Sequence, residues 1–344
     1  MQTLTIVHPD DFHLHLRDGA AMASIVPDSA RRFRRAIIMP NLDPPVVTAA
    51  QATAYRQRIL ACLPAGCRFE PLMTLYLTAQ TTADEIRQAK SSGHVYAVKH
   101  YPTGVTTHAG HGVTDLERVY PVLEAMIEQR LPLLVHGEVP DSDADIFDRE
   151  RIFIERVLVP LQDRFPELRI VLEHISTSEA VEFVKSAPAT VAATITPHHV
   201  MLNRNAMFAG GLQPHYFCRP VLKAERHRRA VLEAATSGHP RFFLGTDSAP
   251  HARSAKETAC GSAGIYSAHN AIELFAELFE AAGFLDRLEA FGSFYGADFY
   301  GLPRNDDTLT LVREQWTVPL TLPFGDDVVV PLHAGRVCQW KLMP

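Results

Sequence analysis

The segment PDDFHLHLRDG, residues 9–19, brings together side chains that could hold a metal ion. His13 and His15 are two residues apart, and Arg17 follows at the same spacing. Because a period of two is typical of a β-strand, we expect these three side chains to share one face. The opposite face is expected to carry the apolar residues Phe12, Leu14 and Leu16. Two imidazoles on one face can reach a single ion, and imidazole is a good ligand of zinc.

Further potential ligands follow other apolar, β-rich runs of the chain. They are Lys99, His136, His174 and Asp247. A single histidine after an apolar strand is more often structural than a ligand. Four histidines and an aspartate at matching positions on different strands are hard to reach by chance. Since catalytic zinc is held by mixed histidine and carboxylate sets with one open position, the combined pattern predicts a catalytic metal site.

Lys99 is unusual in this set, because an ammonium group beside a dication is repelled. One interpretation is that Lys99 points elsewhere or binds an anionic substrate. The other is chemical: a desolvated lysine near a dication has a lowered pKa, and its neutral amine can add carbon dioxide to give a carbamate. The carbamate would be an anionic bridge between two metal ions. Spacing alone leaves both interpretations open.

Eight short apolar runs could position these residues. Besides the opening strand they are 35–39, 70–77, 96–99, 131–136, 169–173, 190–195 and 241–245. Runs without alternation suit strands that are buried on both faces of a parallel sheet. The repeated order of strand, helix and strand predicts an α/β fold, a (β/α)8 barrel of the TIM type. In such barrels the chemistry lies at the C-terminal ends of the strands.

Local signals predict where several helices begin and end. Sequences of the form S/T-x-x-E predict helix starts at Thr82, Thr114 and Ser176. We expect Pro121 to kink the helix that follows Thr114, because proline removes a backbone donor and its ring clashes with the preceding turn. Gly93 is expected to cap the end of a helix before the strand at 96–99.

Composition limits the class of protein. The chain has 344 residues, 47% hydrophobic and 21% charged, which is typical of a soluble globular protein. We expect one barrel domain over 1–344, with a C-terminal tail from about 304. The net charge of −6 argues against a nucleic-acid or membrane partner, and we find no signal peptide or membrane span. Five cysteines without a CxxC pair favour free thiols in a reducing cytoplasm.

Taken together, the ligand residues resemble those of the binuclear amidohydrolase superfamily. Longer blocks resemble the dihydroorotase family in its bacterial single-domain type: DDFHLHLRDG, IIMPNLDPP, LLVHGEV, DIFDRE, ATITPHH and LGTDSAPHARSAKE. The similarity runs from about Asp10 into the C-terminal tail. It implies a zinc-dependent enzyme of pyrimidine (UMP) biosynthesis that reversibly closes N-carbamoyl-L-aspartate to L-dihydroorotate with loss of water. It also implies a cytoplasmic homodimer.

The resemblance implies a role for each potential ligand. His13, His15 and Asp247 would hold one zinc ion, and His136 and His174 the other. Both ions would be bridged by a hydroxide and by Lys99 carboxylated to N6-carboxylysine. In the hydrolytic direction the hydroxide attacks the ring amide, while Asp247 accepts its proton and passes it to the leaving nitrogen.

The resemblance also implies a substrate site. Arg17, Asn41 and His251 would grip the substrate carboxylate, and backbone groups of Leu222 and Ala263 would contact the ring. The complete implied set is His15, Arg17, Asn41, His136, Leu222, His251 and Ala263. A mobile loop at 103–113 would close on the substrate and present Thr106 and Thr107. His100 and Arg219 depart from the family pattern, in which apolar residues are usual, and they bear on this loop and on the pocket wall.

Two other functions fit parts of the pattern. A hydantoinase or dihydropyrimidinase would share the metal core, but its substrates lack the ring carboxylate that Arg17, Asn41 and His251 would bind. A non-catalytic scaffold on the same barrel typically loses ligands, and this sequence keeps the full set.

Overall fold

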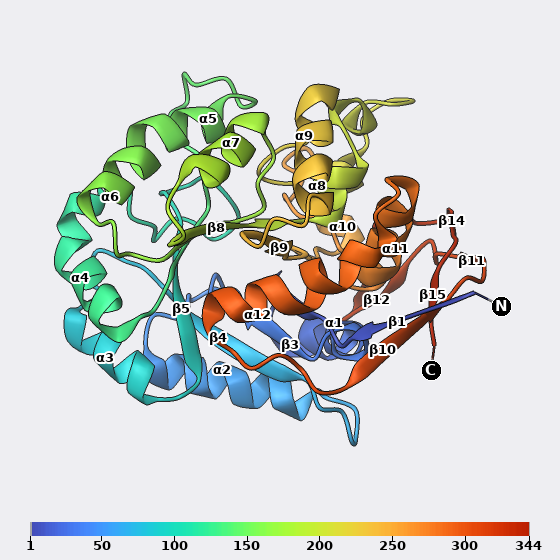
Figure 1. Ribbon diagram of the computed structural model, residues 1–344, viewed down its shortest axis with the longest axis horizontal. Helices are drawn as coiled ribbons and strands as arrows, with labels where there is room; N and C mark the ends of the chain where they lie inside the picture. Colours follow the sequence, from blue (N-terminus) through green and yellow to red (C-terminus); the bar gives the residue numbers. More distant parts are fainter. Residues whose placement is uncertain (1, 344) are drawn as a thin grey trace.

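Eight parallel strands form the centre of the computed structural model, which describes residues 2–343 (Figure 1). They are β2 (Asp10–Leu14), β3 (Arg35–Ile38), β4 (Glu70–Tyr76), β5 (Val95–His100), β6 (Leu133–Val135), β7 (Ile170–Leu172), β8 (Val191–Ile195) and β9 (Phe242–Leu244). Each strand pairs with the next one along the chain. A parallel bridge between Leu14 and Ser248 brings the two edges together. The predicted (β/α)8 barrel and its eight strands are confirmed.

Most helices surround this sheet on its outer side, whereas α12 (Tyr295–Tyr300) crosses one end of the barrel and packs Ala297 and Phe299 against its interior (Figure 1). The longer ones are α1 (Gly19–Arg32), α2 (Ala49–Ala61), α3 (Ala83–Ser91), α4 (Tyr120–Gln129), α7 (Ser178–Ser186), α9 (Glu225–Thr236) and α11 (Ala271–Ala281). Other short ones are α5 (Arg149–Phe153), α6 (Val159–Arg164), α8 (Pro197–Met201) and α10 (Arg253–Lys256). Because the strands are covered outside and filled inside, they contain almost no exposed residue, as expected for a parallel sheet.

Alternate residues along the strands fill two separate apolar cores. The barrel interior holds Phe12, Ile37, Leu72, Ala97, Leu134, Val171, Ala192 and Phe243. The larger core lies between the sheet and the helices and includes Leu14, Ile38, Met73, Val98 and Leu133. Further along the strands the inward positions become polar, as with Lys99 two residues after Ala97. The interior therefore changes from apolar packing to a polar site towards the C-terminal ends of the strands.

The expected alternation in the opening strand is wrong at one position. Phe12 belongs to the barrel interior, where its ring lies 5.2 Å from that of Phe243, whereas Leu14 packs in the outer core. The pairing of β2 with β3 shifts register between Asp11 and Leu14. Since such an irregularity breaks the two-residue period, the neighbours Phe12 and His13 can both face the interior.

Two of the predicted helix signals are confirmed. The Thr82 side chain accepts a hydrogen bond from the backbone N–H of Glu85 and begins α3. Gly93 follows the end of the same helix with φ of 71°, a left-handed conformation that glycine adopts without a steric penalty.

Three other helix predictions are wrong in position or effect. Asp115, not Thr114, caps the short 3-10 turn at 116–119. Thr177, not Ser176, caps α7. Pro121 does not kink a helix, because α4 begins beside it and the first turn needs no donor from that residue.

The end of the chain returns to its beginning. Strand β10 (Thr308–Val312) pairs antiparallel with β1 (Thr3–Val7) and with β15 (Lys341–Leu342), so the two termini lie close together (Figure 1). Two small antiparallel pairs complete this region: β11 (Trp316–Thr317) with β14 (Val337–Cys338), and β12 (Leu322–Phe324) with β13 (Asp327–Val329).

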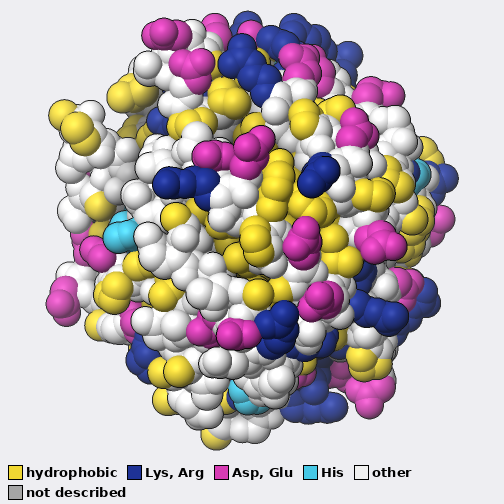
Figure 2. Space-filling view, turned by 90° about the vertical axis from the view of Figure 1, so that its left-hand side faces the viewer, with side chains coloured by type: hydrophobic (Ala, Val, Ile, Leu, Met, Phe, Trp, Pro, Cys, Tyr) yellow, Lys and Arg dark blue, Asp and Glu magenta, His cyan; other side chains and the backbone are white. Residues whose placement is uncertain are grey.

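The surface mixes charges of both signs. On the face that carries α3, α4 and α6, basic and acidic side chains are interspersed with small apolar areas (Figure 2). Within residues 2–343, no helix combines the length and the apolar character needed to cross a membrane.

Candidate metal centre and its pocket

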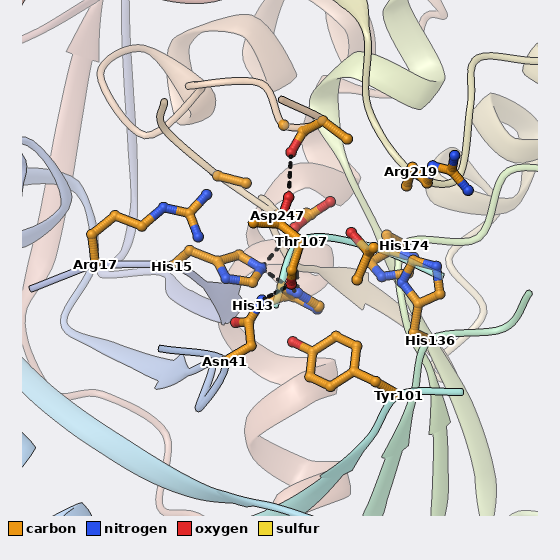
Figure 3. Close-up of a pocket in the computed structure, with 14 residues that line it drawn as sticks. His13, His15, Arg17, Asn41, Tyr101, Thr107, His136, His174, Arg219 and Asp247 are labelled. Carbon is orange, nitrogen blue, oxygen red and sulfur yellow. Dashed lines mark hydrogen bonds and ion pairs between the residues drawn. The ribbon is translucent and has the colours of Figure 1, made fainter. Parts of the chain in front are cut away.

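A pocket of about 350 Å³ opens where the barrel strands end (Figure 3). Its lining comes from several different strands and from the loops beyond them. The lining residues are His13, His15, Arg17, Asn41, Tyr101, Thr106, Thr107, His136, His174, Arg219, Asp247, Ala249, Ala263 and Gly264. Most of the residues that the sequence predicts for the site are therefore brought together.

His13, His15 and Asp247 form a compact group of potential ligands. The Nε2 atoms of the two histidines lie 3.3 Å apart, and Asp247 Oδ1 is 3.4 Å from His13 Nε2 and 3.1 Å from His15 Nε2. All three residues are buried. Burial alone would raise the pKa of Asp247, but the two imidazoles hold that pKa below its usual range. The group thus presents two nitrogens and one carboxylate oxygen to a common point.

Two buried carboxylates that sequence reasoning missed hold this group in place. Glu173 Oε2 lies 2.7 Å from His13 Nδ1 and accepts a hydrogen bond of 2.5 Å from the Thr194 hydroxyl. Asp11 accepts from the backbone N–H groups of both His13 and Thr246, at 3.1 and 2.8 Å. A carboxylate on the far nitrogen of a ligand histidine fixes its tautomer and orientation. Glu173 directly precedes His174 in the sequence, but that adjacency does not indicate its contact with His13, 160 positions away.

Lys99, His136 and His174 form the other side of the centre. The Nζ atom of Lys99 is fully buried without a hydrogen-bond partner, and so is Nδ1 of His174. Burial lowers the pKa of Lys99 to about 8. His136 Nε2 lies 2.8 Å from Glu138 Oε2, which leaves Nδ1 of this pocket-lining ring available. Because unpaired buried polar atoms are costly, this side is suited to a further group that would bond to them.

Backbone conformation also marks the site. Arg17, His174 and Asp247 have φ values of 55°, 43° and 42°. Such positive values are uncommon for residues other than glycine, and they cluster where surrounding structure holds functional side chains in place. In each case the residue follows a barrel strand and turns its side chain to the pocket (Figure 3).

A second compact group, His198, His199 and Cys218, is less suited to an ion. His199 already uses both ring nitrogens, at 2.8 Å from Thr196 Oγ1 and 3.0 Å from the Pro220 carbonyl. The Cys218 thiol lies 3.2 Å from that same carbonyl. Only the His198 ring lacks partners. A metal ion here would have to break these bonds before it gained ligands.

The pocket wall beside Arg17 carries groups suited to an anion. Arg17 Nε donates to the Pro250 carbonyl at 2.8 Å, and its Nη2 lies 3.0 Å from His251 Nε2. Burial and the charge of Arg17 lower the pKa of His251 to about 2, so the ring is neutral. The same Nε2 lies 3.0 Å from the Ala263 carbonyl. A guanidinium with free donors in a buried wall can bind both oxygens of a carboxylate.

Two threonines of the loop at 103–113 reach the pocket. Thr106 and Thr107 both line the pocket, and Asn41 Nδ2 donates to the Thr107 carbonyl at 3.1 Å. Thr107 Oγ1 lies 3.5 Å from the Ala263 carbonyl across the opening (Figure 3). The loop residues therefore approach the wall that contains Ala263.

The side chain of Leu222 packs in an apolar cluster with Met207, Cys218 and Ile265, so the predicted contact of this residue with the substrate could come only from its backbone. Arg219, three residues earlier, lines the pocket. Tyr101 is a further lining residue that sequence reasoning missed, and its hydroxyl is buried without a hydrogen-bond partner. It follows Lys99 by two residues, so the same strand end carries both.

Comparison with known proteins places this geometry in a family. A family model described as amidohydrolase matches residues 11–224. The dihydroorotase of Nitrosococcus oceani is 63% identical over 340 residues, which cover 99% of each chain. Among solved structures, the dihydroorotase of Campylobacter jejuni is 36% identical, with a TM-score of 0.92 over 99% of this chain and 98% of the other. The dihydroorotase of Saccharomyces cerevisiae with bound 5-fluoroorotic acid is 33% identical, also at 0.92, over 100% and 99%.

Proposed function

This chain belongs to the dihydroorotase family of the amidohydrolases, and we propose that it reversibly closes N-carbamoyl-L-aspartate to L-dihydroorotate with loss of water. The observation that carries the proposal is one pocket that joins a set of metal ligands to an anion-binding wall. The metal ligands suit hydrolysis of an amide, and the wall suits the carboxylate that both substrates bear. A cyclic amide without that carboxylate would leave the remaining donors of Arg17, beyond those to Pro250 and His251, without an anion to bind.

We propose that the centre holds two zinc ions. His13, His15 and Asp247 would bind one ion, and His136 and His174 the other, with carboxylated Lys99 between them. The support for the lysine is its buried Nζ without a partner, since a carbamate there would replace an unsatisfied ammonium by an anion with two oxygens. Carboxylation starts from the neutral amine, formed when the ammonium loses one proton; it makes a bond from nitrogen to the carbon of CO₂ and releases a second proton. Two bound ions would polarise the ring carbonyl and lower the pKa of a water from ~15.7 towards ~7.

Residues of the chain would then handle the proton and the substrate. Asp247 is the proposed proton carrier, because its carboxylate faces the ligand histidines at the open side of the pocket. In hydrolysis it would accept a proton from the attacking water and deliver it to the ring nitrogen, and in ring closure it would act in reverse.

Arg17, Asn41 and His251 are proposed to hold the substrate carboxylate, with the Ala263 carbonyl beside them. The neutral His251 ring can accept from Arg17 or donate through the same nitrogen, so it can adjust when the anion binds. Thr106 and Thr107 would cover the bound substrate and exclude water. His15 and His136, which line the pocket, would contact it near the reacting amide.

The test is interconversion of the two compounds by the purified metal-loaded protein, followed in both directions by chromatography. Hydantoin and dihydrouracil serve as cyclic amides without the carboxylate. We expect turnover only with the carboxylate-bearing pair, about two zinc equivalents per chain, and loss of activity on chelation. Arg17→Lys should weaken substrate binding while both metal ions stay, because lysine lacks the bidentate fork. Faster turnover of hydantoin would contradict the assignment.

We also propose that the protein is a single-domain homodimer of the cytoplasm, as the resemblance to its family implies. Mass measurement by light scattering at micromolar concentration tests the assembly. A mass of about twice that of one chain is expected, and a monomeric mass would reject the dimer.

A further inference from the structure

The loop at 103–113 is folded as one compact turn. Gly104 N–H donates to the Ala109 carbonyl at 3.0 Å, Ala109 N–H to the Thr106 carbonyl at 3.2 Å, and Gly112 N–H to the Ala109 carbonyl at 3.2 Å. Two residues of this loop, Val105 and Ala109, are buried in an apolar cluster with Tyr76 and Tyr101. Because these bonds link the turn internally, we expect it to move as a unit, so a contact at one point restrains all of it.

Side chains from outside the loop bond to its backbone at five points. The Tyr76 hydroxyl donates to the His108 carbonyl at 3.3 Å, and the Thr114 hydroxyl accepts from the Thr103 N–H at 3.3 Å. Arg219 Nη1 donates to the Val105 carbonyl at 3.1 Å, and Asn41 Nδ2 donates to the Thr107 carbonyl at 3.1 Å. At the far end, His100 Nε2 lies 2.6 Å from the Val113 carbonyl, which accepts its N–H. The contacts from Arg219 and Asn41 are on either side of Thr106.

The two bonds beside Thr106 come from opposite sides of the barrel mouth. Asn41 follows β3, whereas Arg219 lies in the long connection between β8 and α9. Figure 3 shows Arg219 and Asn41 at opposite edges of the pocket. Since the acceptors are backbone carbonyls two residues apart, the pair fixes the path of the peptide that carries both threonines.

We propose that Arg219 is a positioning residue that holds the 103–113 turn closed, and so aims Thr106 and Thr107 at the bound substrate. This inference rests on the proposed function for its catalytic consequence, but not for the state of the turn. A leucine at this position could form the pocket wall, but it could not donate to Val105. The residue therefore gives this chain a loop contact that an apolar side chain cannot supply.

The first test measures the turn without substrate, by hydrogen exchange and mass spectrometry of peptides that span 103–113. Arg219→Met keeps the side-chain stem but removes the donors, and Arg219→Lys keeps one charged donor. Arg226→Met is the matched control, because Arg226 is exposed on α9 and contributes nothing to the pocket. We expect exchange in the turn to rise about tenfold in Arg219→Met, to return most of the way in Arg219→Lys, and to stay at the parental level in Arg226→Met.

The second test measures steady-state kinetics of the same metal-loaded proteins, with metal content determined. The loss of one charge-assisted hydrogen bond should lower kcat/KM by about ten- to a hundredfold in Arg219→Met, with partial rescue in Arg219→Lys. Part of the loss should be in kcat, because misplaced threonines affect the closed complex. Zinc content and exchange in the β6 peptide should equal those of the parent.

Hydrogen exchange and kinetics together distinguish failure of the positioning role of Arg219 from failure of the proposed activity. If KM rises while exchange in the turn is unchanged, Arg219 contacts the substrate directly and the positioning role is wrong. If exchange and kinetics both stay at parental values, the contact with Val105 has no consequence and the inference fails. If the parent turns over neither dihydroorotate nor carbamoyl aspartate, the proposed function fails, and the exchange data alone still decide whether Arg219 holds the turn.

Discussion

The two halves of the ligand set differ in how complete they are without a metal ion. In the first half, His13, His15 and Asp247 are within 3.4 Å of one another, and Glu173 supports His13 from behind. In the second half, Lys99 Nζ and His174 Nδ1 are buried without a hydrogen-bond partner, although Lys99 Nζ lies 5.0 Å from the centre of the Tyr101 ring. The first half is thus arranged by its own hydrogen bonds, whereas the second has polar atoms that only an added group would satisfy.

This difference between the halves affects the stability of the metal-free protein. An unpaired polar group in a protein interior costs about 1–3 kcal/mol, and more when it is charged. The second half therefore makes the metal-free protein less stable and would gain most from loading. The first half should change little when an ion replaces hydrogen bonds between its own members. Substitutions in the two halves can remove or measure this difference in hydrogen bonding.

The largest effect is expected for Lys99→Met, which has similar length but no polar atom. If Lys99 provides the bridge, the variant should lose metal from the second half and about 10⁴-fold in kcat/KM, since metal ions contribute several kcal/mol to catalysis. The metal-free variant should nevertheless be more stable than the metal-free parent, because the unpaired ammonium is gone. Metal analysis, kinetics and denaturant unfolding check this. An active variant with two ions, or a less stable metal-free one, would contradict it.

Asp247→Asn tests the first half. Asparagine can still offer an oxygen to an ion but cannot move a proton, so general acid–base catalysis worth ~10²–10⁴-fold should be lost in both directions. Opposite pH trends of the two directions are not diagnostic, because ring closure at neutral pH consumes a proton whichever residue carries it. The measurement is kcat both ways, with zinc content determined on the same samples. Parental rates with both ions present would mean that another group carries the proton, and His251 is then the next candidate.

A smaller effect is expected when the free energy of unfolding of the metal-free protein is measured at different pH values. Burial lowers the pKa of Lys99 to about 8, against ~10.4 in an unfolded chain. Between these values the unfolded state binds the proton and the native state does not, so stability rises with pH. The burial penalty of about 3 kcal/mol is fully present below pH 8 and is relieved towards pH 10.4. Lys99→Met should remove this rise.

Lys256 is a second buried lysine with a pKa lowered to about 8. The rise of unfolding free energy with pH in the parent alone therefore cannot be attributed to Lys99. The difference between the parent and Lys99→Met isolates the Lys99 contribution, because Lys256 is the same in both. Unfolding by urea at several pH values from 7 to 9.5 measures it. If the free energy of unfolding changed equally with pH in the two proteins, Lys99 would not titrate between pH 7 and 9.5.

The sequence predicted the framework of the site better than its details. Barrel strands follow from runs of apolar residues, and ligands at strand ends follow from the barrel, so His13, His136 and His174 could be assigned to one pocket. A shift in strand register is not visible in a pattern of residue types, and for that reason Phe12 was assigned to the wrong face. The direction of the Leu222 side chain could not be predicted, because an irregular connection gives no period from which to count.

Supporting residues were the hardest to predict. Glu173 contacts the ligand group through a bond between distant strands, and Asp11 links His13, on its own strand, to the distant Thr246. A buried carboxylate on a strand looks the same in sequence whether it pairs with a histidine or with a threonine. Only the assembled barrel brings Glu173 to the ring of His13, 160 positions away. These contacts depend on the closed sheet, not on local sequence.

The smallest expected effect concerns Glu173 as the support of the first half. Glu173→Ala removes the carboxylate on His13 Nδ1, and loss of such a partner typically weakens metal binding by ~10–100-fold. Glu173→Gln keeps an acceptor for the ring N–H but not the charge, so its loss should be smaller. Glu138→Gln is the matched variant in the second half, where Glu138 contacts His136. Competition with a chelator, with both ions counted, measures each affinity.

In the parent, stepwise chelation should remove the ion of the first half first, because only the second half has unpaired polar atoms that loading satisfies. Glu173→Ala should widen the difference in affinity between the two steps, since it loosens His13 alone, while Glu138→Gln should narrow it. At saturating zinc all three variants should recover most of the parental kcat, because Glu173 and Glu138 orient ligands and do not touch the substrate. If Glu173→Ala left both affinities unchanged, the first half would owe its geometry to the backbone and to Asp247, and the contrast between the halves would have another cause.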